Sequence, residues 1–286
     1  MSDFLVREIF KKEALRLSPE GEAFWYTSGT FGPFYINTHF LAGGEQRAKA
    51  ALALIEESLA AETPKLSEIS DYFAKLEAED ADFRHCIDLA EAKIRELLNN
   101  EQVSHISGGE RRDFFFSFPL ARRFQVPHLT LRKTGELYLS QADGSAIVEK
   151  ANLSGARILH VADIITLASS FFDRWIPAIE AGGAKISYAF AILDRRQGGL
   201  QRLQKAGIET AVLETCNEDF FQLASSVGSI SNVDAEMALH FIDDAKSYEA
   251  AFLKQHPDFL QRSIEAGGSQ AERAQNYLRT HAASED

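Results

Sequence analysis

An acid and three hydroxylated residues gather in one short stretch of the chain, at Asp163, Thr166, Ser169 and Ser170. The carboxylate of Asp163 can accept hydrogen bonds from ribose hydroxyls, while the hydroxyl groups and backbone amides of the other three can hold a phosphate. This chemistry suits a sugar phosphate. The simpler interpretation is that Ser169 and Ser170 cap a helix and that Asp163 belongs to a turn.

The segments on either side of these residues have different hydrophobic patterns. Residues 158–161 form a short apolar run typical of a buried strand, and residues 171–179 carry large apolar side chains at helical spacing. Two glycines at 182–183 end the predicted helix, and residues 186–193 form a second apolar run. The order predicts a βαβ unit with parallel strands, in which ligands bind at the carboxyl ends of the strands.

A second candidate site follows a predicted strand at 103–106. Gly108 and Gly109 would form a glycine-rich turn whose backbone amides approach a ligand closely. Arg111 and Arg112 add planar cationic donors suited to phosphate or carboxylate. The alternative is that these arginines are surface residues paired with the acids beside them.

A third candidate site lies at the end of a predicted strand at 128–131, where Arg132 and Lys133 follow. Residues 135–149 then contain two alternating runs joined by a polar turn, which predicts a hairpin flap. Flaps beside a ligand site often close over it and exclude water.

Most of the remaining chain is predicted to be helical. Residues 3–16 and 62–100 have apolar residues at helical spacing, and the acidic run at 77–82 marks a bend or the join of two helices. From Asn217 onward the pattern is helical, with one long helix over 233–255.

Composition excludes several classes of protein. A net charge of −12 and a pI near 5.2 argue against nucleic acid or an anionic membrane as a main partner. Cys86 and Cys216 are too few for a disulfide framework or a cysteine-rich metal site. No apolar run approaches the roughly 20 residues of a membrane span, and the first residues lack the apolar core of a signal peptide. A soluble, cytoplasmic protein is therefore expected.

Several of these segments, in this order, resemble the type I phosphoribosyltransferases, and most closely the orotate phosphoribosyltransferases. The resemblance covers about 22–42 and 103–213. Residues 26–37 are similar to the N-terminal signature of the family, and residues 107–109 to its pyrophosphate loop. Residues 131–133 are similar to the strand end before the catalytic flap, and residues 194–195 to a short charged step. Residues 161–170 are similar to the motif that binds the ribose and 5-phosphate of phosphoribosyl pyrophosphate.

The resemblance implies an α/β fold. The expected architecture is a type I phosphoribosyltransferase-like parallel sheet flanked by helices, with an N-terminal aromatic hairpin, a helical insertion and a helical C-terminal tail. It implies a phosphoribosyltransferase-like α/β domain at 1–215, which includes the helical insertion at 62–100, and a helical C-terminal extension at 216–286. A homodimer is expected.

The resemblance also implies Mg²⁺-dependent transfer of a phosphoribosyl group between phosphoribosyl pyrophosphate and a pyrimidine-type base. The implied catalytic residues are Lys133, Arg132 and Asp163. The implied substrate-binding residues are Phe34, Tyr35, Ser28, Gly108, Gly109, Arg111, Arg112, Thr166, Leu167, Ala168, Ser169, Ser170 and Arg195. Mg²⁺ is expected to bind through the substrate, with no direct protein ligand, and the ring of Phe34 or Tyr35 is expected to face the base.

The sequence departs from the family pattern at several positions. Ala162 stands where the family has the first of two adjacent acids, and Leu167 and Ala168 replace a small hydroxylated residue and a glycine. These departures favour a catalytically impaired homologue that binds a nucleotide or sugar phosphate as a regulatory or partner protein. The surviving Asp163 and Thr166 favour an active transferase. A purely structural dimer module would have no reason to keep cations and hydroxyls at one edge of a sheet.

Overall fold

The computed structural model describes residues 3–26, 28–149 and 151–282. Internal contacts divide the chain into two compact units. The first unit comprises Met1–Ala14 and Thr38–Cys216, and the second comprises Leu15–Asn37 and Asn217–Asp286. Residues 15–37 thus group with the C-terminal residues, and the predicted domains at 1–215 and 216–286 remain a proposal.

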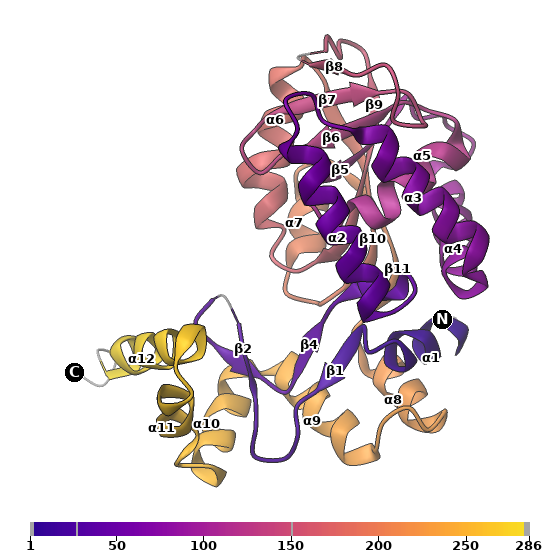
Figure 1. The fold of residues 1–286 in the computed structure, drawn as a ribbon. Helices are drawn as coiled ribbons and strands as arrows, with labels where there is room; N and C mark the ends of the chain where they lie inside the picture. Colours follow the sequence, from indigo (N-terminus) through magenta and orange to yellow (C-terminus); the bar gives the residue numbers. More distant parts are fainter. Residues whose placement is uncertain (1–2, 27, 150, 283–286) are drawn as a thin grey trace. The chain divides into compact units, whose positions relative to one another are not determined.

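The first unit is built on a sheet whose described strands run in the order β11-β10-β9-β5-β6-β7-β8 (Figure 1). The strands are β5 (His105–Gly109), β6 (His128–Leu131), β7 (Leu137–Ser140), β8 (Val148–Glu149), β9 (Arg157–Ile165), β10 (Lys185–Asp194) and β11 (Glu209–Thr215). Strands β11 to β6 pair in parallel, and β7 and β8 pair antiparallel at one edge. The predicted α/β fold class with a mostly parallel sheet is confirmed.

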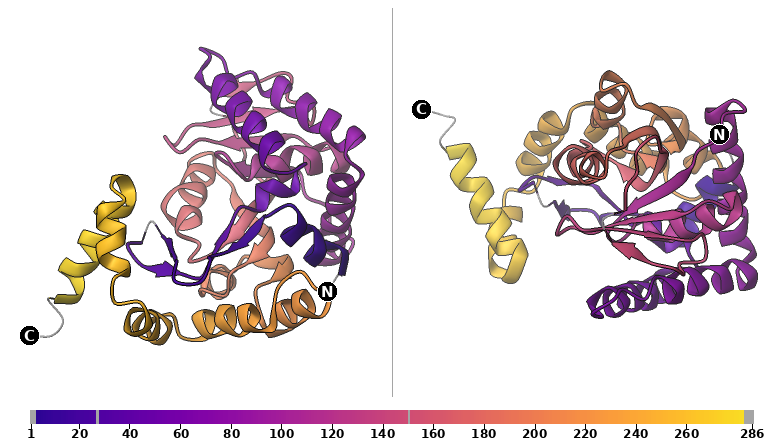
Figure 2. Two further views of the ribbon diagram at one scale, coloured as in Figure 1. Left: turned by 60° about the horizontal axis from the view of Figure 1, so that its bottom comes forward. Right: turned by 90° about the horizontal axis from the view of Figure 1, so that it is seen from above.

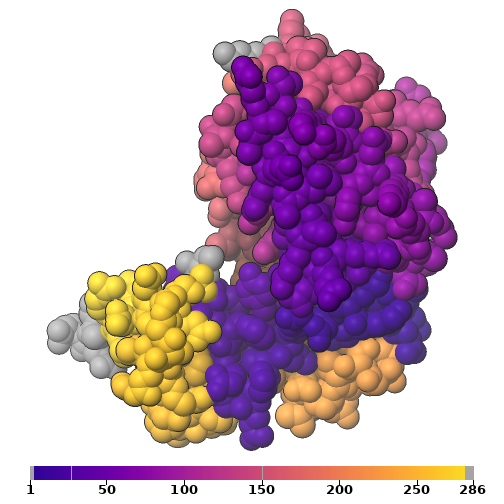
Figure 3. Space-filling view, in the orientation of Figure 1, coloured from indigo at the N-terminus to yellow at the C-terminus, as the bar shows by residue number. Residues whose placement is uncertain are grey.

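Helices cover both faces of this sheet. The helices of the first unit are α1 (Asp3–Lys11), the 3₁₀ turn η1 (Thr38–Leu41), α2 (Glu45–Ala60), α3 (Leu66–Glu79), α4 (Ala81–Leu98), α5 (Phe114–Phe124), the π-helical turn η2 (Phe171–Trp175), α6 (Ile176–Ala181) and α7 (Gly199–Lys205). Helices α4 and α5 pack on one face, and α6 and α7 pack on the other (Figure 2). In the space-filling view, residues 45–98 cover much of the visible face of this unit (Figure 3).

Helix α5 explains the run of phenylalanines in the sequence. Phe114, Phe115, Phe116 and Phe118 are all 0% exposed, because α5 lies between the sheet and helices α3 and α4. A helix that is apolar on all sides must be buried on all sides. The insertion at 62–100 therefore has a packing role, since it covers the outer side of α5.

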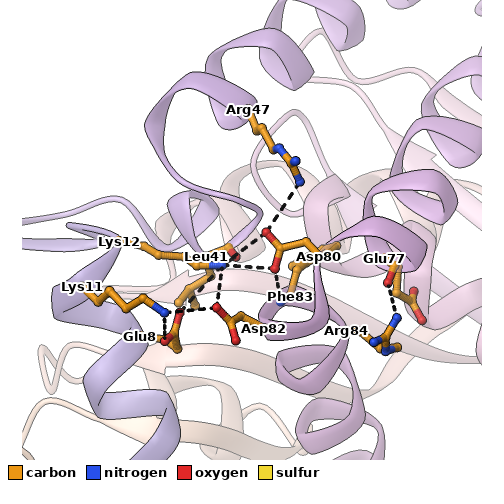
Figure 4. Close-up of polar contacts among 10 residues, drawn as sticks. All are labelled: Glu8, Lys11, Lys12, Leu41, Arg47, Glu77, Asp80, Asp82, Phe83 and Arg84. Carbon is orange, nitrogen blue, oxygen red and sulfur yellow. Dashed lines mark hydrogen bonds and ion pairs between the residues drawn. The ribbon is translucent and has the colours of Figure 1, made fainter.

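The acidic run at 77–82 is the join of two helices, which was one of the two predicted alternatives. Asp80 caps α4, and its Oδ1 accepts a hydrogen bond of 2.9 Å from the backbone N–H of Phe83. The same carboxylate lies 3.3 Å from the ammonium group of Lys12, which also lies 3.8 Å from Glu8 (Figure 4). Lys12 and Glu8 are 11% and 6% exposed, so this ion-pair cluster is largely shielded from water.

Replacing Lys12 by methionine is expected to lower the free energy of unfolding by about 2 kcal/mol, because Glu8 and Asp80 would lose a shielded counter-charge. Lys75 is a matched control, since its side chain is 74% exposed and its partner Glu79 is 52% exposed, so that solvent screens this pair. Lys75→Met should change stability by well under about 1 kcal/mol. Urea unfolding measures both. Equal losses in the two variants would contradict a special role for Lys12.

Two helical predictions are wrong in detail. The helix predicted over 3–16 ends at Lys11, and Leu15–Leu17 forms strand β1. The helix predicted over 233–255 is two helices, α9 (Asn232–Asp243) and α10 (Ala245–Gln255). The break comes at Asp244, whose side chain accepts a hydrogen bond of 3.0 Å from the backbone N–H of Ser247 and so caps α10.

The second unit consists of two short antiparallel strand pairs and five described helices. Strand β1 pairs with β4 (Phe34–Ile36), and β2 (Phe24–Trp25) pairs with β3 (Phe31–Gly32). The remaining helices are α8 (Glu218–Ser226), α11 (Phe259–Glu265) and α12 (Gly268–Ala282). Trp25 stacks on Phe259 with ring centroids 5.6 Å apart, and Phe31 is 0% exposed. The aromatic segment therefore supplies core packing.

Candidate functional site

The predicted βαβ unit is present, but its first strand is longer than expected. Strand β9 continues through Ile165 because it pairs with β10 as far as Asp194, so Asp163 lies within the strand and not in a loop after it. The loop is short, and helical structure starts at Ser169. Ser169 and Ser170 are both exposed. Ser170 makes no side-chain capping hydrogen bond, so the structure does not support the capping interpretation at this residue.

The loop after β9 is held by backbone hydrogen bonds from the segment that follows β10. The N–H of Arg195 donates to the carbonyl of Ile165, and the N–H of Gly199 donates to the carbonyl of Thr166, each at 2.9 Å. A Cβ atom on Gly199 would lie 2.4 Å from that Thr166 oxygen and 2.8 Å from the nitrogen of Ala168. Gly199 therefore packs directly against the backbone of the loop and holds it in place. The Gly-Gly pair in the sequence does not by itself reveal this role.

The substituted positions of the loop differ in their exposure. Leu167 is 57% exposed, so its side chain does not close the turn. Ala168 is buried and has a φ of 56°, the left-handed region that favours glycine. Thr166 is half-buried. The backbone therefore keeps a glycine-like turn at Ala168 although glycine is absent there.

Asp163 is buried and bonded within the protein. It is 7% exposed, and its Oδ2 accepts a hydrogen bond of 2.8 Å from the hydroxyl of Thr38. Its backbone N–H donates to Oδ1 of Asp113 at 3.0 Å, and Oδ2 of Asp113 accepts from the N–H of Gly109 at 2.9 Å. Asp113 thus joins the ends of β5 and β9. Sequence reasoning missed this role and that of Thr38.

Burial raises the pKa of Asp163, the neighbouring Asp113 carboxylate raises it further, and Arg112 and Thr38 act in the opposite direction. A group whose pKa is higher in the folded state stabilises the fold at low pH, and this stabilisation is lost as the pH rises through the folded-state pKa. Relative to Asp163→Asn, the free energy of unfolding of the wild type should fall as the pH rises from about 4, the ordinary aspartate value, through the raised pKa. Urea unfolding at several pH values measures this. Parallel curves for the two proteins would contradict it.

The predicted turn between β5 and α5 is present at residues 110–113, but the two glycines lie outside it, because β5 continues through Gly109. A Cβ atom on Gly108 would lie 2.2 Å from Oγ of Ser117, and one on Gly109 would lie 2.4 Å from the ring of Trp175. Both glycines are therefore needed for close packing of helices on the strand. A role for them in ligand binding stays a prediction.

Two of the predicted cations have protein partners. Arg111 forms an ion pair with Glu56. Arg132 donates from Nε to Glu110 at 3.2 Å and from Nη1 to the carbonyl of Leu59 at 2.8 Å. Glu110, the acid next to Arg111 in the sequence, therefore pairs with Arg132 and not with Arg111. These arginines need to change partners to bind a phosphate.

Arg112 and Lys133 are less constrained than Arg111 and Arg132. Arg112 is half-buried, and its charge acts on Asp163 and on the buried His39. Burial, followed by Arg112 and Arg111, lowers the pKa of His39 to about 3, so this imidazole is neutral near pH 7. Lys133 is exposed, and its backbone N–H donates to Glu110 at 3.2 Å.

The remaining predicted site residues are distributed over both units. Arg195 is half-buried directly after β10. In the second unit Ser28 is exposed and shares a hydrogen bond of 2.8 Å with Thr30. Phe34 is 0% exposed, whereas Tyr35 is half-buried. Of the two rings predicted to face a base, Tyr35 is therefore the one with accessible surface. Thr27, in the same motif, lies outside the described residues.

The predicted hairpin forms from β7 and β8, and its tip contacts the helical insertion. A Cβ atom on Gly144 would lie 2.4 Å from the carbonyl oxygen of Leu66, at the start of α3. The hydroxyl of Ser70 donates to the carbonyl of Ala142 at 3.4 Å. Insertion and flap are therefore in contact.

Among the described residues, no group of three or more His, Cys, Asp or Glu side chains is placed to hold a metal ion. Within the same residues, no helix is long and apolar enough to cross a membrane.

No protein-family model matches the chain. The adenine phosphoribosyltransferase of Treponema pallidum (strain Nichols) is 31% identical over 121 residues, which are 39% of this chain and 61% of that protein. The orotate phosphoribosyltransferase of Saccharolobus solfataricus is 25% identical over 145 residues, 51% of this chain and 69% of that protein. The match to the Treponema protein thus spans less than two thirds of its length.

Two solved structures resemble the fold over most of the chain. The UMP synthase of Leishmania donovani matches with a TM-score of 0.55 and 14% identity, covering 85% of this chain and 42% of that one. The orotate phosphoribosyltransferase of Francisella tularensis matches with a TM-score of 0.50 and 13% identity, covering 84% of this chain and 97% of that one. The chain has the type I phosphoribosyltransferase fold, and its relatives in sequence are adenine and orotate phosphoribosyltransferases.

Proposed function

We propose that the chain is a phosphoribosyltransferase that uses Mg²⁺ and phosphoribosyl pyrophosphate to transfer a phosphoribosyl group to a pyrimidine-type base such as orotate. The observation that carries the proposal is the turn after β9. It ends in two exposed serines at the first turn of a helix, at the carboxyl edge of a parallel sheet. Free helical N–H groups and hydroxyls at such an edge bind phosphate.

The roles of the residues follow from the charge that develops during transfer. Pyrophosphate leaves as positive charge grows on the ribose carbon, so the protein must orient the sugar and neutralise the leaving group. Ser169, Ser170 and the loop amides hold the 5-phosphate. Arg112 and Lys133 lie on the two segments that follow β5 and β6 and supply positive charge for the pyrophosphate.

The acidic residues of the site fit an Mg²⁺ ion that binds through the substrate better than one that the protein binds directly. Asp163 and Asp113 already accept hydrogen bonds from protein groups and lie beside a half-buried arginine, which is a poor environment for a directly bound cation. Mg²⁺ keeps several waters and binds readily to phosphate oxygens. Bound in this way, it supplies charge neutralisation for the leaving group.

A second candidate function is supported by the bonding of Asp163. Its carboxyl group is 7% exposed and accepts from Thr38, so a ribose hydroxyl must compete with an internal partner. Arg111 and Arg132 are also engaged by acids. A catalytically impaired homologue that binds a nucleotide or sugar phosphate, as a regulatory or partner protein, needs only the phosphate turn.

Calorimetric titration with phosphoribosyl pyrophosphate and Mg²⁺, followed by assays of orotate and adenine consumption, separates the two functions. Binding with turnover is the expected result for the transferase, and binding without turnover of orotate or adenine supports the impaired homologue. No binding would defeat both. Asp163→Asn should weaken binding, and an unchanged affinity would show that the ribose does not contact this side chain.

The proposal extends to the setting of the reaction. A cytoplasmic homodimer acting in pyrimidine biosynthesis is the arrangement that the family resemblance implies. Light scattering of the purified full chain tests the dimer, and a monomer at micromolar concentration would contradict it.

A further inference from the structure

A cavity of about 880 Å³ lies in the second unit, and none of its lining residues is discussed above as a phosphate ligand. It is formed by the loop at 18–22 and by helices α9 and α10, and all of its lining residues belong to this unit. Its volume is within the range of small-molecule sites, about 300 to 1,000 Å³. The proposed transferase activity assigns no role to it.

The interior wall of this cavity is aromatic. Tyr248 and Phe252 both line it and are 5% and 8% exposed. Their rings stack at an interplanar angle of 25°, with centroids 5.9 Å apart. Met237, from α9, lines the cavity as well. Such a wall suits an apolar or aromatic body, and the faces of the rings attract a cation.

Two buried hydroxyl groups belong to residues of the same lining. Ser18 is 9% exposed and Tyr248 is 5% exposed. Neither hydroxyl has a hydrogen-bond partner in the part of the chain that the structure describes. A buried hydroxyl without a partner costs about 1 to 3 kcal/mol, so a ligand that supplies a donor would relieve this cost.

Apart from His240 and His256, the charged side chains of the lining all have one sign. Carboxylates are present at Glu20, Glu22, Asp234 and Glu236, and no lysine or arginine lines the cavity. Glu22 is neutralised by an ion pair with Arg262. Glu20 and Glu236 are exposed at the rim, and no described residue forms an ion pair with either. This potential repels phosphates and carboxylates, the groups carried by phosphoribosyl pyrophosphate and orotate.

We propose that this cavity binds a small organic cation, a primary amine carried on an aromatic or apolar body. The ring stack receives the body, the ammonium group donates hydrogen bonds, and the carboxylates of Glu20 and Glu236 attract the charge. The inference is independent of the transferase activity, because it uses residues of the second unit alone.

The test is a ligand-observed NMR titration of the full chain at low ionic strength with 2-phenylethylamine, using 3-phenylpropionate as the anionic probe of similar shape. The amine should bind at least about tenfold more tightly than the anion, and its affinity should fall as salt is added. Equal affinities for the two probes, or no detectable binding of the amine, would overturn the proposal.

Two variants locate the site. Glu20→Gln/Glu236→Gln removes two exposed charges without burying anything and should weaken amine binding by about fivefold or more. Glu57→Gln/Glu62→Gln, in the first unit, changes the net charge equally and should leave affinity unchanged. Met237→Trp should block the cavity, provided that its thermal unfolding midpoint matches the wild type. If the two charge variants bind the amine equally, the cavity is not the site.

Discussion

Replacing Asp113 by alanine is expected to lower the free energy of unfolding by about 3 kcal/mol. The carboxylate is 8% exposed and accepts hydrogen bonds from the backbone N–H groups of Gly109 and Asp163. Each buried donor left without a partner costs about 1 to 3 kcal/mol. The loss of one negative charge beside Asp163 offsets part of this cost, because the two carboxylates repel each other.

A buried histidine lies beside the same carboxylate. Oδ2 of Asp113 lies 3.5 Å from Nε2 of His160, whose Nδ1 shares a hydrogen bond of 2.9 Å with the hydroxyl of Ser107. Ser107 and His160 are both 0% exposed. No substrate can reach Ser107 or His160, so the Ser, His and Asp arrangement acts as a structural network at the central strands β5 and β9 and not as a nucleophilic centre.

Urea unfolding measures the prediction for Asp113. Asp113→Asn keeps one oxygen acceptor and should lose less than the alanine variant, while Asp173→Ala, at an exposed aspartate of the same unit, should change stability by less than about 0.5 kcal/mol. A loss in Asp113→Ala no larger than in the Asp173 control would mean that the two N–H groups find other acceptors.

Much of the sheet could be predicted because its signals are local. Strand β6 has the predicted bounds, and β10 differs from its predicted range by one residue at each end. The order strand, turn, helix, strand around Ser170 is present because apolar runs and glycines mark it in the sequence. The resemblance to the phosphoribosyltransferases and the fold class also rested on these local segments, and both are confirmed.

The errors come from features that depend on distant residues. The end of β9 is determined by its pairing with β10, which no local pattern reveals. Gly108 and Gly109 looked like a turn, yet their lack of side chains accommodates Ser117 and Trp175 on neighbouring helices. An acidic residue within a helical pattern, such as Asp244, gives no sign that it caps a new helix.

The candidate site was predicted as a place but not as a set of contacts. The turn after β9 was found from its hydroxylated residues, and it lies at the expected edge of the sheet. The partner of Asp163 could not be found, because Thr38 is 125 residues away in the sequence. Arg132 was expected to be available for a ligand, yet Glu110 and the Leu59 carbonyl occupy its donors. The number of charged residues can be read from a sequence, whereas the partner of each charged side chain is known only from the folded structure.

Replacing Gly199 by alanine is expected to weaken the binding of phosphoribosyl pyrophosphate by about a hundredfold, given the proposed function. The added Cβ would lie 2.4 Å from the carbonyl oxygen of Thr166, which is backbone and cannot rotate away. The turn that carries Ser169 and Ser170 must therefore shift. A displacement of about 1 Å in a positioning element can cost a factor of about 100.

Gly198→Ala is the matched control for this variant. Gly198 has a φ of 90°, so alanine there is strained, but a Cβ atom would meet nothing within 4 Å. The Gly198→Ala control thus carries a conformational cost without displacing the turn. It should bind phosphoribosyl pyrophosphate with the same affinity as the wild type. Calorimetry at matched Mg²⁺ concentration measures both variants, with thermal unfolding to confirm that each is folded. If Gly199→Ala binds as tightly as Gly198→Ala, the phosphate does not occupy this turn, because a ligand held by the loop amides cannot be insensitive to their movement.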